Sequence, residues 1–198
     1  MKKLILGSSS PARQTLLKQL KIPFEIMTPD IDETPQAGET ASKLVKRLSK
    51  AKAEALIPKA PGAILITCDQ VGDFEGEILG KPLIREAAHK NLSRFSGKSI
   101  TFHSGLCVTD TDTHKCEETI IETVVTFREL SDEVIDAYLN HENALNCAGG
   151  LKVEGFGITL LESVKSDDQS ALIGLPLIAL CSFLDKQGYS VFKAASRK

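Results

Sequence analysis

The first twenty residues restrict the fold most, because a strand-like run leads directly into a helix-like run. Residues 4–6 are continuously apolar and indicate a short buried strand. After a turn of one glycine and three serines, Pro11 suits the first position of a helix, where its missing N–H costs nothing. Leu16, Leu17 and Leu20 then share one helical face. This strand–turn–helix order is typical of α/β proteins.

The turn between these two elements is also a candidate anion site. A helix N-terminus presents unpaired backbone N–H groups and the positive end of a dipole. Three serine hydroxyls and Arg13 accompany it in this sequence. An ordinary helix start capped by serine uses the same residues, so this stretch alone leaves both interpretations open.

The remaining chain continues to alternate strands with helices. The patterns predict strands at 22–27, 63–67, 100–109 and 117–127, and helices at 39–57, 85–97, 130–140 and 176–188. One stretch passes from hairpin to hairpin without a helix, which favours an α/β fold with a mixed sheet over a purely parallel one. Because no linker or repeat interrupts the chain, we expect a single domain over residues 1–198.

Composition and charge exclude several classes of protein. The net charge of −2 argues against binding a nucleic acid polymer, which requires a concentrated basic surface. Five widely separated cysteines without a CxxC pair indicate a reduced, cytoplasmic protein rather than a disulfide scaffold. The N-terminus has too few apolar residues for a signal peptide, and no run is long enough to span a membrane. We therefore expect a soluble cytoplasmic protein without membrane contacts.

Acidic residues near strand ends and loops are the next candidates. Asp69 follows the apolar run at 63–67, where partial desolvation would perturb its pKa as in acid–base groups. A cap on the following turn explains Asp69 equally well from this stretch alone. Asp30, Asp32 and Glu33 crowd one polar loop, and for the first two we favour a solvated turn.

Basic residues complete a possible phosphate site. Lys81 is held at a turn between a glycine and a proline, although most such lysines only solvate a loop. Lys152 and Glu154 alternate along an expected strand and would project from one face. The four histidines lack metal-ligand spacing, and Cys68 has no neighbouring base that would make it a nucleophile.

Taken together, these residues predict an enzyme that handles a polyphosphate. Arg13 and one or two lysines would hold phosphates, while Glu33 and Asp69 could hold a divalent cation and activate water. Neither a Walker motif nor GxGxxG is present, so the two common nucleotide cradles do not apply.

The order of short motifs carries a resemblance over nearly the whole chain. The motifs are SSSPAR, DETP, a lysine in a long helix, CDQV, GKP, FHSGLCV, CAGGLKVEGFGI and LIGLPLIAL, from residue 3 to about residue 188. In this order and spacing the sequence resembles the Maf-like nucleoside triphosphate pyrophosphatases. LKVEGFGI and CDQV are most similar to the 7-methyl-GTP pyrophosphatase branch rather than the dTTP/UTP branch.

The resemblance implies roles for the catalytic and phosphate-binding residues. Asp69 matches the proton acceptor of the family, and Ser8 and Arg13 match its phosphate-binding serine and arginine. Lys52 matches the helix lysine, and Lys81 matches the lysine of GKP. Hydrolysis between the first and second phosphates would leave a monophosphate and pyrophosphate. Cations placed near the bridging oxygens would lower the energy barrier to this hydrolysis.

The resemblance also implies a metal, a fold and a basis for specificity. Glu33 matches the acidic DE motif of the family, whose members commonly use a divalent cation, so we expect Glu33 and Asp69 to hold Mg²⁺ or Mn²⁺. Ala12, Gln70 and Glu154 match positions that tune base choice. The implied fold is an elongated mixed sheet with flanking helices and a cleft between two lobes, similar to inosine triphosphate pyrophosphatases, and the implied assembly is a homodimer.

The identity of the base rests mainly on Glu154. A 7-methylguanine ring carries positive charge and two donors on its Watson–Crick edge, both of which a carboxylate can accept. However, Ala12 stands where some close relatives carry an aromatic side chain that could stack on the base. The alternatives are a pyrophosphatase for dTTP, UTP or another modified nucleotide, and a non-catalytic nucleotide-binding regulator of septum formation.

Overall fold

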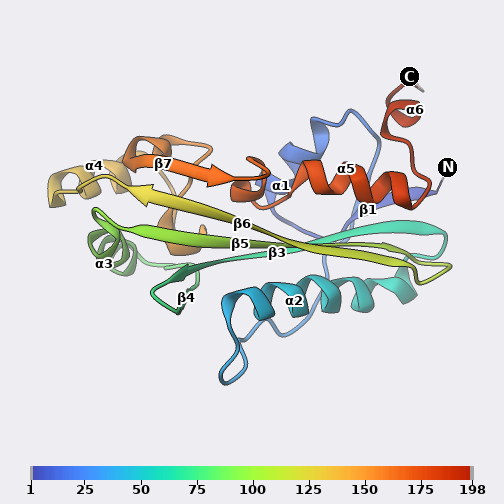
Figure 1. Ribbon diagram of the computed structural model, residues 1–198, viewed down its shortest axis with the longest axis horizontal. Coiled ribbons are helices and arrows are strands. Elements are labelled where there is room, and N and C mark those ends of the chain that lie inside the picture. Colours follow the sequence, from blue (N-terminus) through green and yellow to red (C-terminus); the bar gives the residue numbers. More distant parts are fainter. Residues whose placement is uncertain (1, 197–198) are drawn as a thin grey trace.

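The computed structural model describes residues 2–196. Within these residues the chain forms a long mixed sheet of seven strands (Figure 1). The strand order is β2-β1-β3-β5-β6-β7, and β4 pairs with the end of β3. The strands are β1 Lys3–Leu6, β2 Glu25–Ile26, β3 Ala63–Phe74, β4 Glu77–Leu79, β5 Ser99–Asp110, β6 Cys116–Phe127 and β7 Leu161–Ser166. Pairs β1–β2 and β1–β3 are parallel and the others are antiparallel, which confirms the mixed α/β sheet.

Helices flank both faces of this sheet. They are α1 Pro11–Lys18, α2 Ala41–Leu56, α3 Arg85–Phe95, α4 Asp132–His141, α5 Leu177–Lys186 and α6 Val191–Ala195. Short 3-10 turns add η1 Ile57–Lys59, η2 Ala148–Gly150, η3 Phe156–Leu160 and η4 Ala171–Ile173. Helix α2 covers one face, and α1 and α5 lie on the other (Figure 1). No helix within residues 2–196 is long and apolar enough to cross a membrane.

Two large clusters of the hydrophobic core lie toward the two ends of the long sheet, and a small third cluster joins α2 and β3 around Leu56 and Leu65. One cluster joins β1, α1 and α5 around residues such as Leu6, Leu17 and Leu180. A second cluster joins α3, α4 and the far ends of β5 and β6 around Phe95 and Phe127. Because each cluster packs mainly within itself, the sheet carries two lobes, as expected, and the space between them is available for a ligand.

Two strands differ in length from the sequence expectation. The strand predicted at 63–67 continues to Phe74, because β5 pairs with it as far as Asp73 and so completes its hydrogen bonds despite the polar side chains. Asp69 therefore lies within β3 rather than at its end. The strand expected at 22–27 shrinks to Glu25–Ile26, since β1 pairs with only these two residues.

The strand expected around Lys152 and Glu154 is wrong. Residues 153–155 form a turn, in which the Lys152 carbonyl oxygen accepts hydrogen bonds from Gly155 N at 3.3 Å and Gly157 N at 3.1 Å. A carbonyl that accepts from residues three and five positions ahead cannot take part in a ladder with a neighbouring strand. Lys152 and Glu154 consequently do not share a strand face.

Candidate active site

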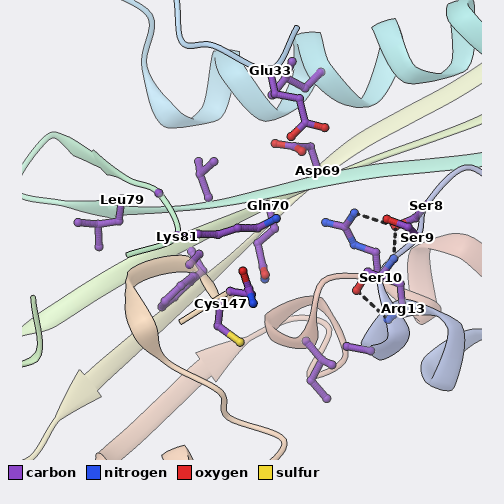
Figure 2. Close-up of a pocket in the computed structure, with 18 of the residues that line it drawn as sticks. Ser8, Ser9, Ser10, Arg13, Glu33, Asp69, Gln70, Leu79, Lys81 and Cys147 are labelled. Atoms are coloured by element: carbon purple, nitrogen blue, oxygen red, sulfur yellow. Dashed lines mark hydrogen bonds between the residues drawn. The ribbon is translucent and has the colours of Figure 1, made fainter. Parts of the chain in front are cut away.

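One cleft between the two lobes collects the nine residues to which the family resemblance assigns a role. It has a volume of about 570 Å³, which suits a nucleotide-sized ligand. The site residues that line it are Ser8, Ala12, Arg13, Glu33, Lys52, Asp69, Gln70, Lys81 and Glu154. Figure 2 shows Arg13 and the serines on one side, Lys81 and Cys147 on the other, and Glu33 beside Asp69. Segments far apart in sequence therefore meet around one space.

The serine-rich turn fixes Arg13 at one wall of this cleft. Ser10 caps α1 by accepting a hydrogen bond from Arg13 N, so the structural role of the turn is present. The Arg13 guanidinium donates to Ser8 Oγ at 3.3 Å, Cys68 O at 3.1 Å and Gly174 O at 2.9 Å. These three acceptors orient a permanent cation beside the positive end of α1, an arrangement that suits an anion.

The Cys68 carbonyl is available to Arg13 because β3 loses its neighbour at this point. Strand β1 pairs with β3 only as far as Leu6 and Ile66, and Gly7 N adds one last bond to Ile66 O. Beyond Ile66 this edge of β3 faces the cleft until β4 pairs with it at Gly72. An unpaired strand edge requires other partners for its polar groups, and Arg13 provides one.

Lys52, Asp69 and Glu33 form the charged centre of the cleft. The Lys52 ammonium lies 2.7 Å from Asp69 Oδ1 and 2.8 Å from Glu33 Oε1. Lys52 and Asp69 are 5% and 6% exposed, whereas the Glu33 side chain is 55% exposed. Glu33 is thus the one member of the three that faces solvent, and a ligand can approach the buried pair from the side of Glu33.

Opposing influences act on the proton affinity of Asp69. Burial raises its pKa above the ordinary value, because the charged form is desolvated. The charge and hydrogen bond of Lys52 and the charge of Arg13 lower the pKa, while the charge of Glu33 raises it, and the net direction is upward. A carboxylate with a raised pKa in a cleft is suited to accept a proton from water.

Close packing of α2 on the sheet brings Lys52 to Asp69. Gly105 is the β5 partner of Asp69, and a Cβ atom at Gly105 would lie 2.6 Å from the Val45 carbonyl oxygen. Only a glycine allows the helix backbone to approach this closely. The Thr67 hydroxyl then donates to the Ser49 carbonyl oxygen at 2.7 Å and fixes α2 along β3.

A second arginine holds the loop that carries Glu33. Arg47 on α2 donates two hydrogen bonds of 2.7 Å to Glu39 and one of 3.1 Å to Thr34 O, next to Glu33. The bidentate bond lowers the pKa of Glu39 to about 2. Arg47 and Glu39 have no role that the sequence revealed, because a separation of eight residues across the start of α2 gives no recognisable signal.

Lys81 and the residues expected to select the base, namely Ala12, Gln70 and Glu154, lie on different sides of the cleft. Exposed Lys81 follows β4, exposed Glu154 lies in the turn at 153–155, and half-buried Ala12 lies in the first turn of α1. Gln70 Nε2 donates to Ser104 Oγ, Ala171 O and Leu172 O at 2.8–3.1 Å. Gln70 thus fixes η4 at the rim of the cleft, a structural role that the sequence did not reveal.

The loop that carries Glu154 is anchored from α4. The Tyr138 hydroxyl donates to Gly150 O and accepts from Lys152 N, both at 3.0 Å. Glu142 accepts from Lys152 Nζ at 2.6 Å and from Phe156 N at 2.9 Å. Lys152 therefore supports the loop by an ion pair and does not line the cleft, so a role in binding phosphate is not indicated.

Several cleft residues were not singled out from the sequence. They include Leu44, Leu48, Phe102, Asn146, Cys147 and Leu151. The hydrophobicity pattern assigns the apolar members to the core, so the sequence gives no signal that they line a cleft instead. Asn146 directly precedes the CAGG motif and Cys147 begins it, and this motif was the one sequence signal that these two residues belong to the site. Cys68 is fully buried and its pKa is raised by burial, so it is not a nucleophile.

The donor set fits a cation held by few protein ligands. Within residues 2–196, no group of three or more histidine, cysteine or acidic side chains could hold a metal ion. Two carboxylates, Glu33 and Asp69, nevertheless converge on the single Lys52 ammonium. Mg²⁺ is commonly bound through one or two carboxylates together with water and substrate phosphates. The two carboxylates meet that requirement.

Comparisons with known proteins agree with the geometry. The family model described as "Maf-like protein" matches residues 3–187. A 7-methyl-GTP pyrophosphatase from Cupriavidus metallidurans is 51% identical over 191 residues, covering 96% of both chains. Proteins of the same name from Cupriavidus pinatubonensis and Methylobacillus flagellatus are 47% and 44% identical, covering 97% and 96% of this chain and 96% and 100% of theirs. The resemblance seen in the motifs is thus confirmed, and this chain belongs to the Maf-like family.

Proposed function

We propose that the protein hydrolyses 7-methyl-GTP to 7-methyl-GMP and pyrophosphate, and so removes a modified nucleotide. Relatives that bear this activity in their names share 42–51% of their residues with this chain over nearly its whole length. The observation that carries the proposal is the convergence of Asp69, Lys52 and Glu33 opposite Arg13 in one cleft. This arrangement places a proton acceptor among cations that can hold a triphosphate.

In the proposed reaction Asp69 accepts a proton from the attacking water. Water then attacks the first phosphorus, and the bond to the bridging oxygen breaks. Negative charge grows on the departing pyrophosphate, where Arg13, Lys52 and Lys81 offset it. Ser8 and the N–H groups at the start of α1 orient the phosphates. In the chain alone, Lys52 also keeps Asp69 in its charged form, as a base requires.

We propose a divalent cation, Mg²⁺ or Mn²⁺, as cofactor, held by Glu33 and Asp69. When bound, such an ion polarises phosphate oxygens and neutralises their charge. Glu33 is half exposed and Asp69 is buried, so the pair spans the depth of the cleft and can bridge protein and substrate. Lys52 lies against both carboxylates and would have to share them with the ion.

Base recognition is assigned to the wall that carries Glu154. Its carboxylate can accept both Watson–Crick-edge donors of 7-methylguanine and offset the ring charge. The absence of an aromatic at Ala12 removes one stacking surface from the opposite side. Leu151 and Val153 supply apolar contact area in the same loop.

A substrate panel tests the proposal most directly. Pyrophosphate release is measured from 7-methyl-GTP, GTP, UTP and dTTP with Mg²⁺ or Mn²⁺, and 7-methyl-GTP is expected to give the highest kcat/KM. A preference for UTP or dTTP would contradict the substrate assignment. Tight binding of a nucleotide with no turnover by the wild-type chain would instead support the regulator of septum formation.

Asp69→Asn tests the catalytic assignment. We expect turnover to fall about 10²- to 10⁴-fold, while nucleotide binding stays within about tenfold. Asp73→Asn on the same strand is the matched control, because Asp73 caps the turn before β4 by accepting from Gly76 N. Equal losses in both variants would remove Asp69 from its role.

We also propose a cytoplasmic homodimer that binds no nucleic acid polymer. All five cysteines are free, which agrees with a reducing compartment, and the net charge is −2. Exposed apolar side chains on η3 and β7, namely Phe156, Ile158 and Val164, offer surface for a second copy. Sedimentation of the purified protein at several concentrations measures the assembly state.

A further inference from the structure

Two thiols meet on the sheet outside the cleft. Cys107 Sγ on β5 lies 2.8 Å from Cys116 Sγ on β6. Cys116 is the strand partner of Thr109, two positions along from Cys107, so both thiols project from the same face. This is the face covered by α2, because Gly105 on the same side of β5 contacts the Val45 backbone. The cross-strand geometry directs the two sulfur atoms toward each other.

The two thiols differ in accessibility. Cys107 is 1% exposed, whereas Cys116 is exposed at the start of β6. A hydrogen bond from the Cys107 thiol lowers the pKa of Cys116 to about 6, and the same contact together with burial raises the pKa of Cys107. The solvent-facing Cys116 sulfur is therefore the one that loses its proton more readily and so supplies the reactive thiolate, while its neighbour keeps its proton.

The remaining cysteines lack this arrangement. Cys68 is buried, Cys147 and Cys181 are partly buried, and burial raises the pKa of each thiol. Within residues 2–196 the contact between Cys107 and Cys116 is the only one between two thiols. The sequence conceals the pair, because nine positions and a hairpin turn separate its members.

We propose that Cys107 and Cys116 form a reversible dithiol–disulfide modification site that reacts with hydroperoxides. The Cys116 thiolate attacks the peroxide, a sulfur–oxygen bond forms, the oxygen–oxygen bond breaks, and the leaving oxygen takes up a proton as water or an alcohol. The Cys107 sulfur then attacks the Cys116 sulfenic acid, a disulfide forms, and the hydroxyl leaves as water with the Cys107 proton. Two thiols are oxidised and one peroxide is reduced.

The position of the pair explains what the modification would change. The disulfide would join β5 and β6 next to the turn at 111–115 and close a small ring across their hairpin. Cys107 is also the strand partner of Thr67, whose hydroxyl holds the Ser49 carbonyl of α2. The cross-link would therefore fix the part of the sheet on which α2 is seated, and a small-molecule thiol would release it.

Peptide mapping after mild oxidation tests the proposal. The reduced full-length protein is treated with a small excess of hydrogen peroxide, the remaining thiols are alkylated, and peptides are analysed without reduction. We expect a linked peptide containing Cys107 and Cys116, lighter by two hydrogen atoms and reversed by dithiothreitol. A folded wild-type protein that keeps all five thiols, or that oxidises Cys181 as fast as Cys116, would overturn the proposal.

Three variants assign the two roles. Cys107→Ala should halt the reaction at the Cys116 sulfenic acid, which dimedone traps, and should raise the pH at which Cys116 becomes reactive toward iodoacetamide. Cys116→Ser should abolish both products and, because its side chain is exposed, should fold normally. Cys181→Ser is the matched control and should leave the cross-link unchanged. Dimedone labelling of Cys107 in Cys116→Ser, at the rate seen for Cys116, would contradict the order of reaction.

Discussion

The Lys52 ammonium lies 2.7 Å from Asp69 Oδ1, and both side chains are almost fully buried. One partner comes from the middle of a helix and the other from the middle of a strand, 17 residues later. Burial of an ion pair is costly unless both charges keep good partners. Here Glu33 is the additional partner of Lys52, at 2.8 Å. The pair is therefore a charged centre that solvent and ligands can reach from one side only.

Removal of the ammonium should disable this centre. In Lys52→Met, Asp69 and Glu33 face each other without a cation, so we expect at least a 10²-fold loss of kcat/KM. Lys46→Met is the control, since Lys46 on the same helix pairs with exposed Glu118 at the surface. Steady-state pyrophosphate release measures both. Activity of Lys52→Met within threefold of the control would show that the ammonium is dispensable.

The pH dependence of the reaction should reflect the raised pKa of Asp69. A base must be deprotonated, so kcat/KM should fall on the acid side at a pH above 3.8, the ordinary pKa of the group. Lys52→Gln removes two influences that lower this pKa, and the acid limb of its residual activity should move to still higher pH. The profile is measured with a single nucleotide at the lowest Mg²⁺ concentration that supports turnover, because an ion bound to Asp69 would itself lower this pKa. An acid limb at or below pH 3.8 in the wild type would exclude Asp69 as the group that titrates.

Gly105→Ala tests the close approach of α2. The added methyl group would meet the Val45 carbonyl oxygen at 2.6 Å, so the helix must move outward. We expect a loss of about 1–3 kcal/mol in unfolding free energy, and a lower kcat as Lys52 moves away from Asp69. Ser99→Ala, at the exposed end of the same strand, serves as control. Urea denaturation and turnover are the measurements, and unchanged values for both would refute the packing argument.

Arg47→Lys tests whether the Glu33 loop is held by a bidentate bond. Lysine keeps the charge but cannot make both hydrogen bonds to Glu39, so the loop should loosen and more Mg²⁺ should be needed for half-maximal rate. Arg94→Lys is the control, because Arg94 makes a similar bidentate contact with Glu77 on another part of the chain. Equal Mg²⁺ requirements in the two variants would count against the loop assignment.

The pKa of Glu39 gives a related stability prediction. Its folded pKa of about 2 lies below its ordinary value of 4.5, so the ion pair stabilises the protein above pH 4.5 and this contribution is lost as the pH falls toward 2. Glu39→Gln should therefore lower the unfolding temperature at pH 7 and have little effect near pH 2. Calorimetric scans at both pH values measure the difference. A variant equally destabilised at both would show that the charge is unimportant.

Tyr138→Phe tests the anchor of the Glu154 loop. The change leaves Gly150 O and Lys152 N without their shared partner in a buried site, at a cost of about 1–3 kcal/mol. We also expect KM for 7-methyl-GTP to rise more than KM for GTP, because Glu154 is displaced. Tyr189→Phe is the control, since Tyr189 is also a largely buried tyrosine but its hydroxyl makes no hydrogen bond within residues 2–196. Similar KM ratios in both variants would separate this tyrosine from specificity.

The sequence alone determined the mixed α/β architecture and the residues that gather at the site. Apolar periodicity placed α2 correctly, because burial of one helix face requires that spacing. The serine turn before Arg13 was recognisable because the first N–H groups of a helix require a side chain that accepts their hydrogen bonds. Local pattern did not find where β3 ends, because its pairing with the distant strand β5 decided this. It also missed the turn at 153–155, a loop that Tyr138 and Glu142 anchor from positions 14 residues away from their partners.

Only the tertiary structure decided which distant side chains come into contact. The contacts of Lys52 with Asp69 and Glu33 depend on how closely α2 approaches the sheet, which the absent side chain of Gly105 sets. The meeting of Cys107 with Cys116 likewise depends on the register of one hairpin. A sequence records which groups are present, but distances between groups far apart in the chain follow from packing, which sums many weak contacts along its whole length.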